Sequence, residues 1–211
     1  MRCTKLMSER IIKSVNDNIS KQQTYKKLLG RYKLAIKNDF YFEAMIIVYA
    51  MLEDRLRSVL YHTGVLINKD KLLVHKKTKL YVKNIVATYQ EGDKVSLGMK
   101  NITGKMNIIE AMFNWATECE NPEDKYLVLL KSTIESTDIG AVLETIDNLK
   151  GWLEYRNEVI HAAMNKDIDS LFSDLSERVE EGMRYARLID NQSAVLRKKS
   201  LIRKKMNMGN N

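Results

Sequence analysis

This chain contains few of the residues that interrupt helices or cross-link loops. Its 211 residues include one proline, nine glycines and two cysteines. Leu, Ile, Met, Ala, Lys and Glu fill the runs between them, and these residues favour helix. Strand signals are scarce, and the best candidate, Lys79–Val82, fits a helix equally well. Two cysteines are too few for a disulfide framework or a metal cluster, so Cys3 and Cys119 are expected to be free thiols.

Long apolar runs are also missing. No segment reaches the roughly 18 consecutive apolar residues that a transmembrane helix needs. Residues 1–5 lead into polar sequence rather than into the apolar core of a signal peptide. The expected location is therefore cytoplasmic, with no membrane partner. The three histidines, His62, His75 and His161, lack zinc-ligand spacing, and no Gly-rich phosphate loop occurs, so neither a metal nor a cofactor is expected.

The predicted fold class is all-α, an up-and-down helical bundle of about seven helices. A hydrophobic content of 45% supports one packed domain. We assign residues 1–190 to this domain and residues 191–211 to a basic tail that is either helical or disordered. The expected helices cover about 5–36, 40–61, 69–90, 104–120, a segment from Asn121, 140–165 and 170–190, the last of which could continue into the tail.

Local signals set several helix ends. Residues 40–61 are the most apolar segment and should form the central helix of the core, with Gly64 as a left-handed stop after it. A loop is expected over 91–104. Asn121 is then predicted to cap the fifth helix, with Pro122 in the first turn, because asparagine and proline favour these positions.

The net charge of +8 is concentrated in two places. Residues 197–205 carry six basic side chains and no acid, and residues 69–83 carry six lysines against Asp70. Basic runs of this kind suit a polyanion such as RNA, although an ordinary solvated surface explains them as well. The candidate RNA-binding residues are Lys76, Lys77, Lys79, Arg197, Lys198, Lys199, Arg203, Lys204 and Lys205.

One motif in the sixth predicted helix carries the chemistry. In the segment 155–163, Arg156 precedes His161 by five residues and Asn157 follows the arginine. An imidazole can transfer protons near neutral pH, and a guanidinium can hold a phosphate by two bonds as charge develops on it. These two groups are sufficient for RNA cleavage without a metal.

The spacing by itself is a weak signal, because Arg57 and His62 repeat it. A surface arginine and a histidine at the end of the core helix explain that second pair. Asn157 and His161 are four residues apart and share one helix stripe. Arg156 lies about 140° around the helix from His161. A site therefore requires that the arginine reach around the helix, that the helix bend, or that a second copy of the helix supply part of the site.

The motif resembles that of the HEPN superfamily, which includes all-helical prokaryotic toxins, abortive-infection proteins and RNA-guided ribonucleases. Its hallmark is an arginine, a polar residue, a few further positions and a histidine, here Arg156-Asn157-Glu158-Val159-Ile160-His161. The family often has an acidic residue in an early helix, and Glu53 in the run 50–56 matches it. In helix order, the resemblance covers roughly residues 5–190.

The resemblance implies a homodimer that cleaves RNA without a metal. On this hypothesis, His161 is the general acid and base, Arg156 stabilises the phosphate, Asn157 orients one of them, and Glu53 holds Arg156 or tunes the cleft. The 2′-hydroxyl attacks the phosphate and leaves a 2′,3′-cyclic end. An antitoxin or defence-system protein would be a further partner. One subfamily has a tyrosine where this chain has Ala163, so the nucleotidyltransferase that modifies that tyrosine is not expected here.

Two other interpretations remain open at the level of the sequence. The chain could be a non-catalytic helical module that binds RNA or a protein through its basic tail. It could also be a purely structural bundle, in which His161 is a buried, hydrogen-bonded histidine and Arg156 pairs with Glu53 or Glu158.

Overall fold

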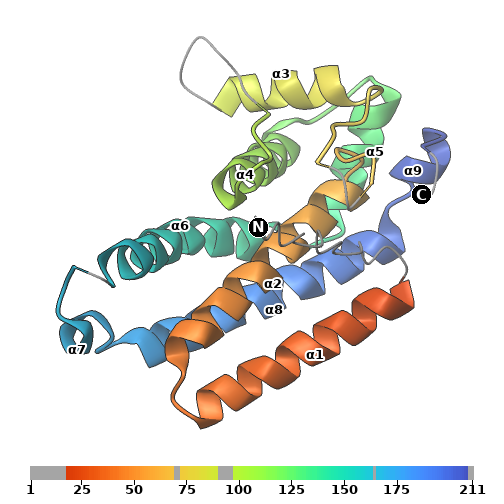
Figure 1. Ribbon diagram of the computed structural model, residues 1–211. Helices are drawn as coiled ribbons and strands as arrows, with labels where there is room; N and C mark the ends of the chain where they lie inside the picture. The colour runs from red at the N-terminus through yellow and green to blue at the C-terminus, as the bar shows by residue number, and fades with distance from the viewer. Residues whose placement is uncertain (1–17, 69–71, 90–96, 164, 209–211) are drawn as a thin grey trace, which may run out of the picture.

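The computed structural model describes residues 18–68, 72–89, 97–163 and 165–208, and these ranges form helices joined by turns and loops (Figure 1). The helices are α1 Asn18–Lys37, α2 Tyr41–His62, α3 Lys79–Tyr89, α4 Ile102–Glu118, α5 Lys125–Glu135, α6 Ile139–Ala162, α7 Ile168–Leu171, α8 Leu175–Lys199 and α9 Ile202–Lys205. Seven of them have eleven residues or more, which confirms the all-α class and the expected helix number. Within these ranges there is no strand, and no helix is long and apolar enough to cross a membrane.

Helix α2 is the centre of the core. Its side chains Met45, Leu52 and Leu56 are fully buried, as its apolar composition predicted. It packs along α8, which runs in the same direction, and the buried hydroxyl of Ser193 donates to that of Ser58 at 2.8 Å. Helix α1 lies antiparallel to α2 on the outside of this pair (Figure 1).

Helix α6 packs antiparallel to α8, from the Tyr155–Asp174 bond at the start of α8 to the bond between the Asp138 N–H and the Gln192 side chain. The indole of Trp152 on α6 is buried and its Nε1 donates to the backbone carbonyl of Arg178 at 2.7 Å. Gly182 makes this approach possible, because a Cβ at that position would lie 2.6 Å from the indole ring. A glycine inside α8 therefore fixes how closely α6 can lie.

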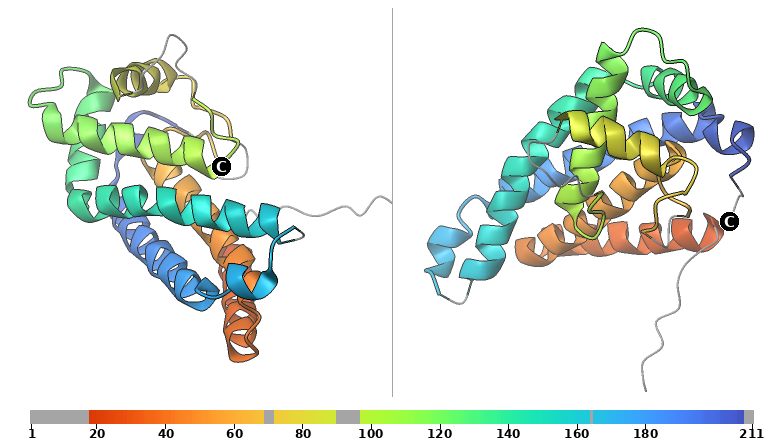
Figure 2. Two further views of the ribbon diagram at one scale, coloured as in Figure 1. Left: turned by 90° about the vertical axis from the view of Figure 1, so that its left-hand side faces the viewer. Right: turned by 90° about the horizontal axis from the view of Figure 1, so that it is seen from above.

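Helices α3, α4 and α5 form a second group beside the layer of α1, α2, α6 and α8 (Figures 1 and 2). An ion pair of 2.9 Å between Lys150 and Glu110 joins α6 to α4. The phenol of Tyr126 on α5 is buried and donates to the carbonyl of Thr63 at the end of α2. The two groups therefore share the core around α2.

The end of α2 confirms the prediction for Gly64. Gly64 has φ +77°, its N–H donates to the carbonyl of Tyr61, and the N–H of Val65 donates to the carbonyl of Leu60. This pair of bonds is the Schellman arrangement that a left-handed glycine allows.

Two predicted helix starts are wrong. The helix expected from residue 69 begins at Lys79, because Leu66 and Val74 pair in an antiparallel bridge and the Thr78 hydroxyl donates to the Gly64 carbonyl. The helix expected from Asn121 begins at Lys125. Its N-cap is Asp124, whose carboxylate makes no cap bond and instead accepts from the Tyr81 hydroxyl at 3.0 Å. In both places a contact with a distant segment decides the start.

The basic tail is helical and docked. The predicted boundary at residue 190 lies inside α8, which continues to Lys199. After it, α9 places Ile202 in the core, and Met208 is also buried. The segment predicted as one helix from residue 170 is divided into α7 and α8.

Several predictions concern residues outside the described ranges. These are Cys3, residues 5–17 of the first predicted helix, Lys69 and Lys71 of the basic run, and residues 91–96 of the predicted loop. Of the two cysteines, Cys119 is described and is a free thiol.

We predict that Gly182→Ala lowers the free energy of unfolding by about 1–3 kcal/mol, because the new methyl group overlaps the Trp152 indole. Gly151→Ala is the matched control: it also lies inside a helix, but a Cβ there meets nothing within 4 Å. That variant should gain about 0.5–1 kcal/mol from helix propensity. Urea denaturation followed by circular dichroism measures both, and equal effects would contradict the packing explanation.

Candidate functional site

Arg156 lies half-buried on the side of α6 that faces α2. Its guanidinium carbon is 4.2 Å from the centre of the Tyr49 ring, and its Nη1 donates to the side-chain oxygen of Asn157 at 2.9 Å. The Nε is buried and makes no hydrogen bond with any residue that the structure describes. A guanidinium over an aromatic face is held by the ring quadrupole, so Arg156 is fixed in direction while part of its hydrogen-bonding capacity remains unused.

Asn157 and His161 lie on the exposed side of the same helix. They are one turn apart, with His161 in the last turn of α6. In the described part of the chain, His161 makes no hydrogen bond or ion pair. The buried histidine of the structural interpretation is therefore not what is observed at this position, since the imidazole faces solvent.

Arg156 and His161 do not meet within one chain. The arginine is directed onto α2 and the histidine is exposed, and no described hydrogen bond joins them. Asn157 is bonded to Arg156. Only the arginine is therefore oriented by this amide.

The last turns of α6 are anchored to the beginning of α8. The Tyr155 hydroxyl donates to Asp174 at 2.8 Å, and burial together with this bond raises the pKa of Tyr155. Arg178 lies 5.3 Å over the Tyr155 ring and pairs with Asp174 and Glu181. These contacts hold the helix segment that presents Asn157 and His161.

Glu53 is placed near this region but makes no described contact with Arg156. One of its oxygens accepts from Arg57 at 2.7 Å and from Lys105 at 3.1 Å. Lys105 is fully buried and also donates to the Asn101 carbonyl, at 3.0 Å. Glu53 thus joins α2 to α4.

The ionisation of this cluster follows from its contacts. Burial works to raise the pKa of Glu53, but the hydrogen bonds from Arg57 and Lys105 outweigh it and lower the pKa. Burial lowers the pKa of Lys105, against the opposing effect of Glu53. The carboxylate is the group that compensates a buried ammonium.

The structure also describes Glu158, the other expected partner of Arg156, and the second arginine–histidine pair. Glu158 pairs with Lys166 at 2.6 Å. Arg57, which we expected to be a surface arginine, has a side chain that is 31% exposed and pairs with Glu53, and His62 is buried in the last turn of α2.

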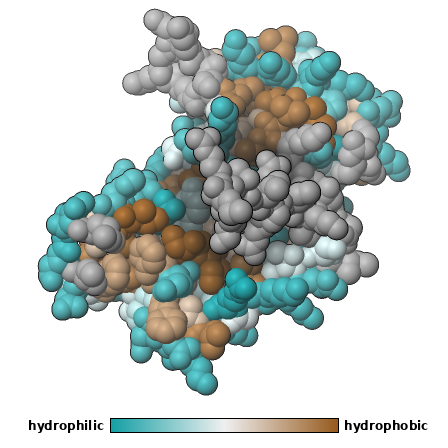
Figure 3. Space-filling view, viewed as in Figure 1, coloured by the Kyte–Doolittle hydropathy of each residue, from teal (hydrophilic) through white to brown (hydrophobic). Residues whose placement is uncertain are grey.

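Tyr49 is the residue that sequence reasoning missed. It lies four residues before Glu53, so both are on one stripe of α2. That stripe also carries Ile46, which is 39% exposed, and Ala50, which is exposed too. Figure 3 shows apolar side chains gathered on this face between α6 and α2. An aromatic residue one turn before the expected acid was the signal available in the sequence.

The predicted RNA-binding residues fall into two groups. Lys77 and Arg203 donate to backbone carbonyls, Lys77 to Met206 and Arg203 to Leu66 and Ile67. The other predicted residues are exposed: Lys76, Lys79, Arg197, Lys198, Lys199, Lys204 and Lys205.

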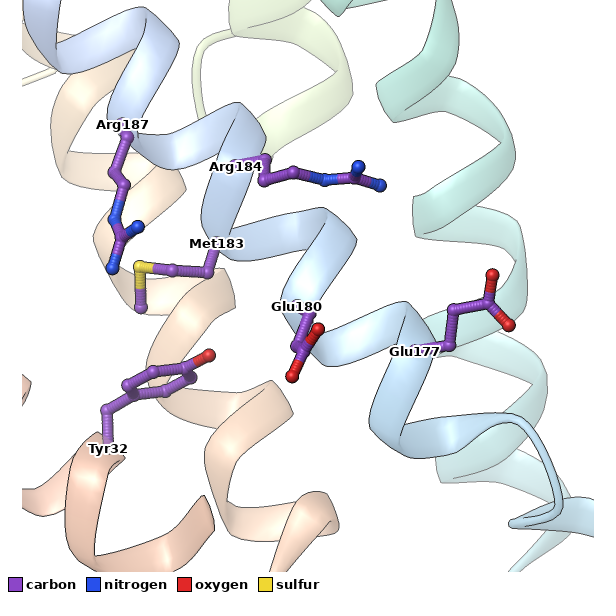
Figure 4. A pocket seen from close by; sticks show the side chains of 6 residues that line it. All are labelled: Tyr32, Glu177, Glu180, Met183, Arg184 and Arg187. Carbon is purple, nitrogen blue, oxygen red and sulfur yellow. The ribbon is translucent and has the colours of Figure 1, made fainter.

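A depression of about 440 Å³ lies between α1 and α8 (Figure 4). Tyr32 and Met183 form its apolar part, and its charged side chains are Glu177, Glu180, Arg184 and Arg187. None of the predicted site residues lines it. In the described ranges, no group of three or more His, Cys, Asp or Glu side chains is placed to hold a metal ion.

Comparisons of this chain with protein-family models, with curated proteins and with solved structures gave no match.

We predict that Glu53→Ala lowers the free energy of unfolding by about 3 kcal/mol, because it leaves the buried Lys105 ammonium without its counter-charge. Glu158→Ala is the control, since the side chains of its ion pair with Lys166 are both more than half exposed, and this pair should contribute under about 0.5 kcal/mol. Denaturant unfolding at neutral pH measures both.

The free energy of unfolding that Glu53→Ala loses should also depend on pH. A lowered folded-state pKa stabilises the fold above the ordinary value of 4.5, and this contribution is lost as pH falls through the folded-state pKa. The difference between the wild type and Glu53→Ala should therefore shrink in acid. A difference that stays constant down to acid pH would contradict the ionic explanation.

Proposed function

We propose that this chain is a HEPN-like, metal-independent endoribonuclease whose active site is completed by a second copy of the chain. The observation that carries the proposal is the arrangement around α6. Arg156 is held against Tyr49 and Asn157, and the exposed His161 lies on the same stripe as Asn157.

The roles follow from chemistry and position. The 2′-hydroxyl of RNA attacks the adjacent phosphorus, a bond forms from the 2′-oxygen, and the bond to the 5′-oxygen breaks. One His161 imidazole takes the 2′-hydroxyl proton, and the His161 imidazolium of the second copy protonates the leaving oxygen. Arg156 stabilises the charge on the phosphate oxygens, and the products are a 2′,3′-cyclic phosphate and a 5′-hydroxyl.

Geometry favours two copies. Within one chain the arginine and histidine are about 140° apart around α6, and Arg156 faces α2 while His161 faces solvent. The apolar side chains Ile46 and Ala50 lie exposed beside Tyr49 on α2. We assign this face, together with the end of α6, to a homodimer interface, with Glu53 supporting it from the α2 side.

The wider biological setting is part of the same proposal. A ribonuclease of this kind fits a prokaryotic toxin or phage-defence protein, restrained by an antitoxin or a related partner. Its expected location is the cytoplasm, where its RNA substrate is.

The purified protein should cleave single-stranded RNA in the presence of EDTA. Arg156→Ala and His161→Ala should each lower the rate by about 100-fold or more, because each removes a group that acts on the reacting phosphate. The products are identified by their cyclic phosphate ends on a denaturing gel.

Two controls accompany this assay. Arg184→Ala and His75→Ala remove the same residue types elsewhere and should leave the rate unchanged, and thermal unfolding shows that each variant is folded. Intact RNA with the wild type, or full activity in His161→Ala, would refute the enzymatic proposal.

Ile46→Glu should convert the dimer to a monomer and abolish cleavage, because a carboxylate on this face cannot be buried against its own copy. Leu34→Glu is the matched control: Leu34 is 61% exposed on α1, is not among the residues assigned to the interface, and its replacement adds the same charge. Light scattering gives the oligomeric state. A fully active monomer would overturn the two-copy site.

A further inference from the structure

Two basic segments that are far apart in the sequence meet at one end of the molecule. The Nζ of Lys77 donates to the carbonyl of Met206 at 2.8 Å and to that of Asn207 at 3.4 Å. The guanidinium of Arg203 donates to the carbonyls of Leu66 and Ile67 at 3.0 and 2.8 Å. The residues just after α2 and the residues around α9 therefore form one surface.

Two cations build this surface. Arg203 is half-buried, lies 4.0 Å over the Tyr61 ring, and has its pKa lowered by burial. Lys77 donates to backbone carbonyls just after α9. The last carbonyls of a helix have no hydrogen-bond partner within the helix, so this lysine supplies one. Both side chains are engaged in holding the chain together, so neither is the natural contact for a ligand.

The other cations of the two segments point into solvent. Described residues 72–83 and 195–208 contain no acidic residue. Their exposed basic side chains make no described ion pair, and we refer to these eight together as the basic surface. They are Lys76, Lys79, Lys83, Arg197, Lys198, Lys199, Lys204 and Lys205.

The basic surface lies at the opposite end of α8 from the motif. Tyr155, next to Arg156, is bonded to Asp174 at the start of α8, whereas Arg197 is in its last turn. The 22 residue steps from Leu175 to Arg197 correspond to about 33 Å along the helix. Figures 1 and 2 place α7 and α9 at opposite ends of the molecule accordingly.

We propose that the basic surface is a second RNA-binding site, which holds the phosphate backbone and is separate from the Arg156 and His161 site. Exposed lysines and arginines on two segments that carry no acidic residue bind phosphates by charge and by counterion release. The choice of RNA over other polyanions rests on the proposed function. Recognition is of the backbone and not of base sequence, because the exposed side chains of the basic surface are lysines and an arginine, and the nearby rings of Tyr61 and Tyr81 are engaged with Arg203 and with Tyr126.

Charge substitutions test this surface better than truncation does. Removing the tail would also remove the buried side chains of Leu196, Ile202 and Met208 and so damage the core. The test variant replaces Lys76, Lys79, Lys198 and Lys204 with glutamine. The control replaces Lys26, Lys27, Lys33 and Lys37, exposed residues of α1, with glutamine, so both lose four positive charges.

Binding is measured by fluorescence anisotropy with a labelled RNA hairpin, in the His161→Ala background, over a series of salt concentrations. Because His161→Ala is designed to be inactive, the anisotropy measures binding without cleavage. The binding result can therefore be interpreted even if the wild type does not cleave RNA. The test variant should bind roughly tenfold or more weakly at about 0.1 M salt, with a salt slope smaller by up to about 3. The control should bind like its parent.

Three results would overturn the proposal. Unchanged affinity in the test variant would show that these lysines do not contact RNA. Equal losses in test and control would show a general effect of net charge. Unchanged RNA binding with lost binding to phosphatidylserine vesicles would assign the surface to a membrane. Thermal unfolding of both variants verifies that the fold is kept.

Discussion

The contact between α2 and α8 is the constraint on which the rest of the structure depends. The two helices run in parallel, and the small side chains of Ser58 and Ser193 let them approach while satisfying each other's hydroxyls. An ion pair of 3.1 Å from Arg55 to Asp190 extends the contact toward solvent. Because α8 is 25 residues long, it positions α6 at its beginning and α9 at its end. The motif and the basic surface are thus held apart by a rigid element.

Arginine on an aromatic ring is a recurring way of joining elements in this protein. In each case a guanidinium from one segment covers a tyrosine of another, so that the ring is shielded while the guanidinium nitrogens can still reach polar partners. The described pairs are Arg55 with Tyr25, Arg156 with Tyr49, Arg178 with Tyr155 and Arg203 with Tyr61. Arg156 is one member of this set. It differs from Arg55, Arg178 and Arg203 in having no described ion pair or carbonyl partner, and it bonds only the neighbouring Asn157.

The sequence predicted where the helices lie better than it predicted which side chains contact one another. The apolar run of α2 identified the core helix, and Gly64 identified its end, because both depend on residues adjacent in the chain. The cap at Asn121 was predicted on equally good local grounds and was wrong. The Tyr81 hydroxyl donates to the Asp124 carboxylate, and the two residues are 43 positions apart in the sequence.

In the candidate site, too, features set within one helix were predicted and contacts between helices were not. Asn157 and His161 were correctly placed on one helix stripe, since four residues make about one turn. Glu53 was expected to hold Arg156 or to tune the cleft, and its carboxylate pairs with the buried Lys105 on α4 and with Arg57 instead of with Arg156. The ring that does hold Arg156 belongs to Tyr49, and no local pattern pairs residues 49 and 156.

By itself, then, the sequence determined the helical class, the core helix and the spacing of the motif, all of which depend on propensity and periodicity along the chain. Only the tertiary structure decided which groups meet. It buried Lys105 against Glu53, set Trp152 on Gly182, and brought Lys77 to the carbonyls after α9. Such contacts are set by how helices pack around a shared core, and packing geometry is not encoded in the spacing of residues along any one helix.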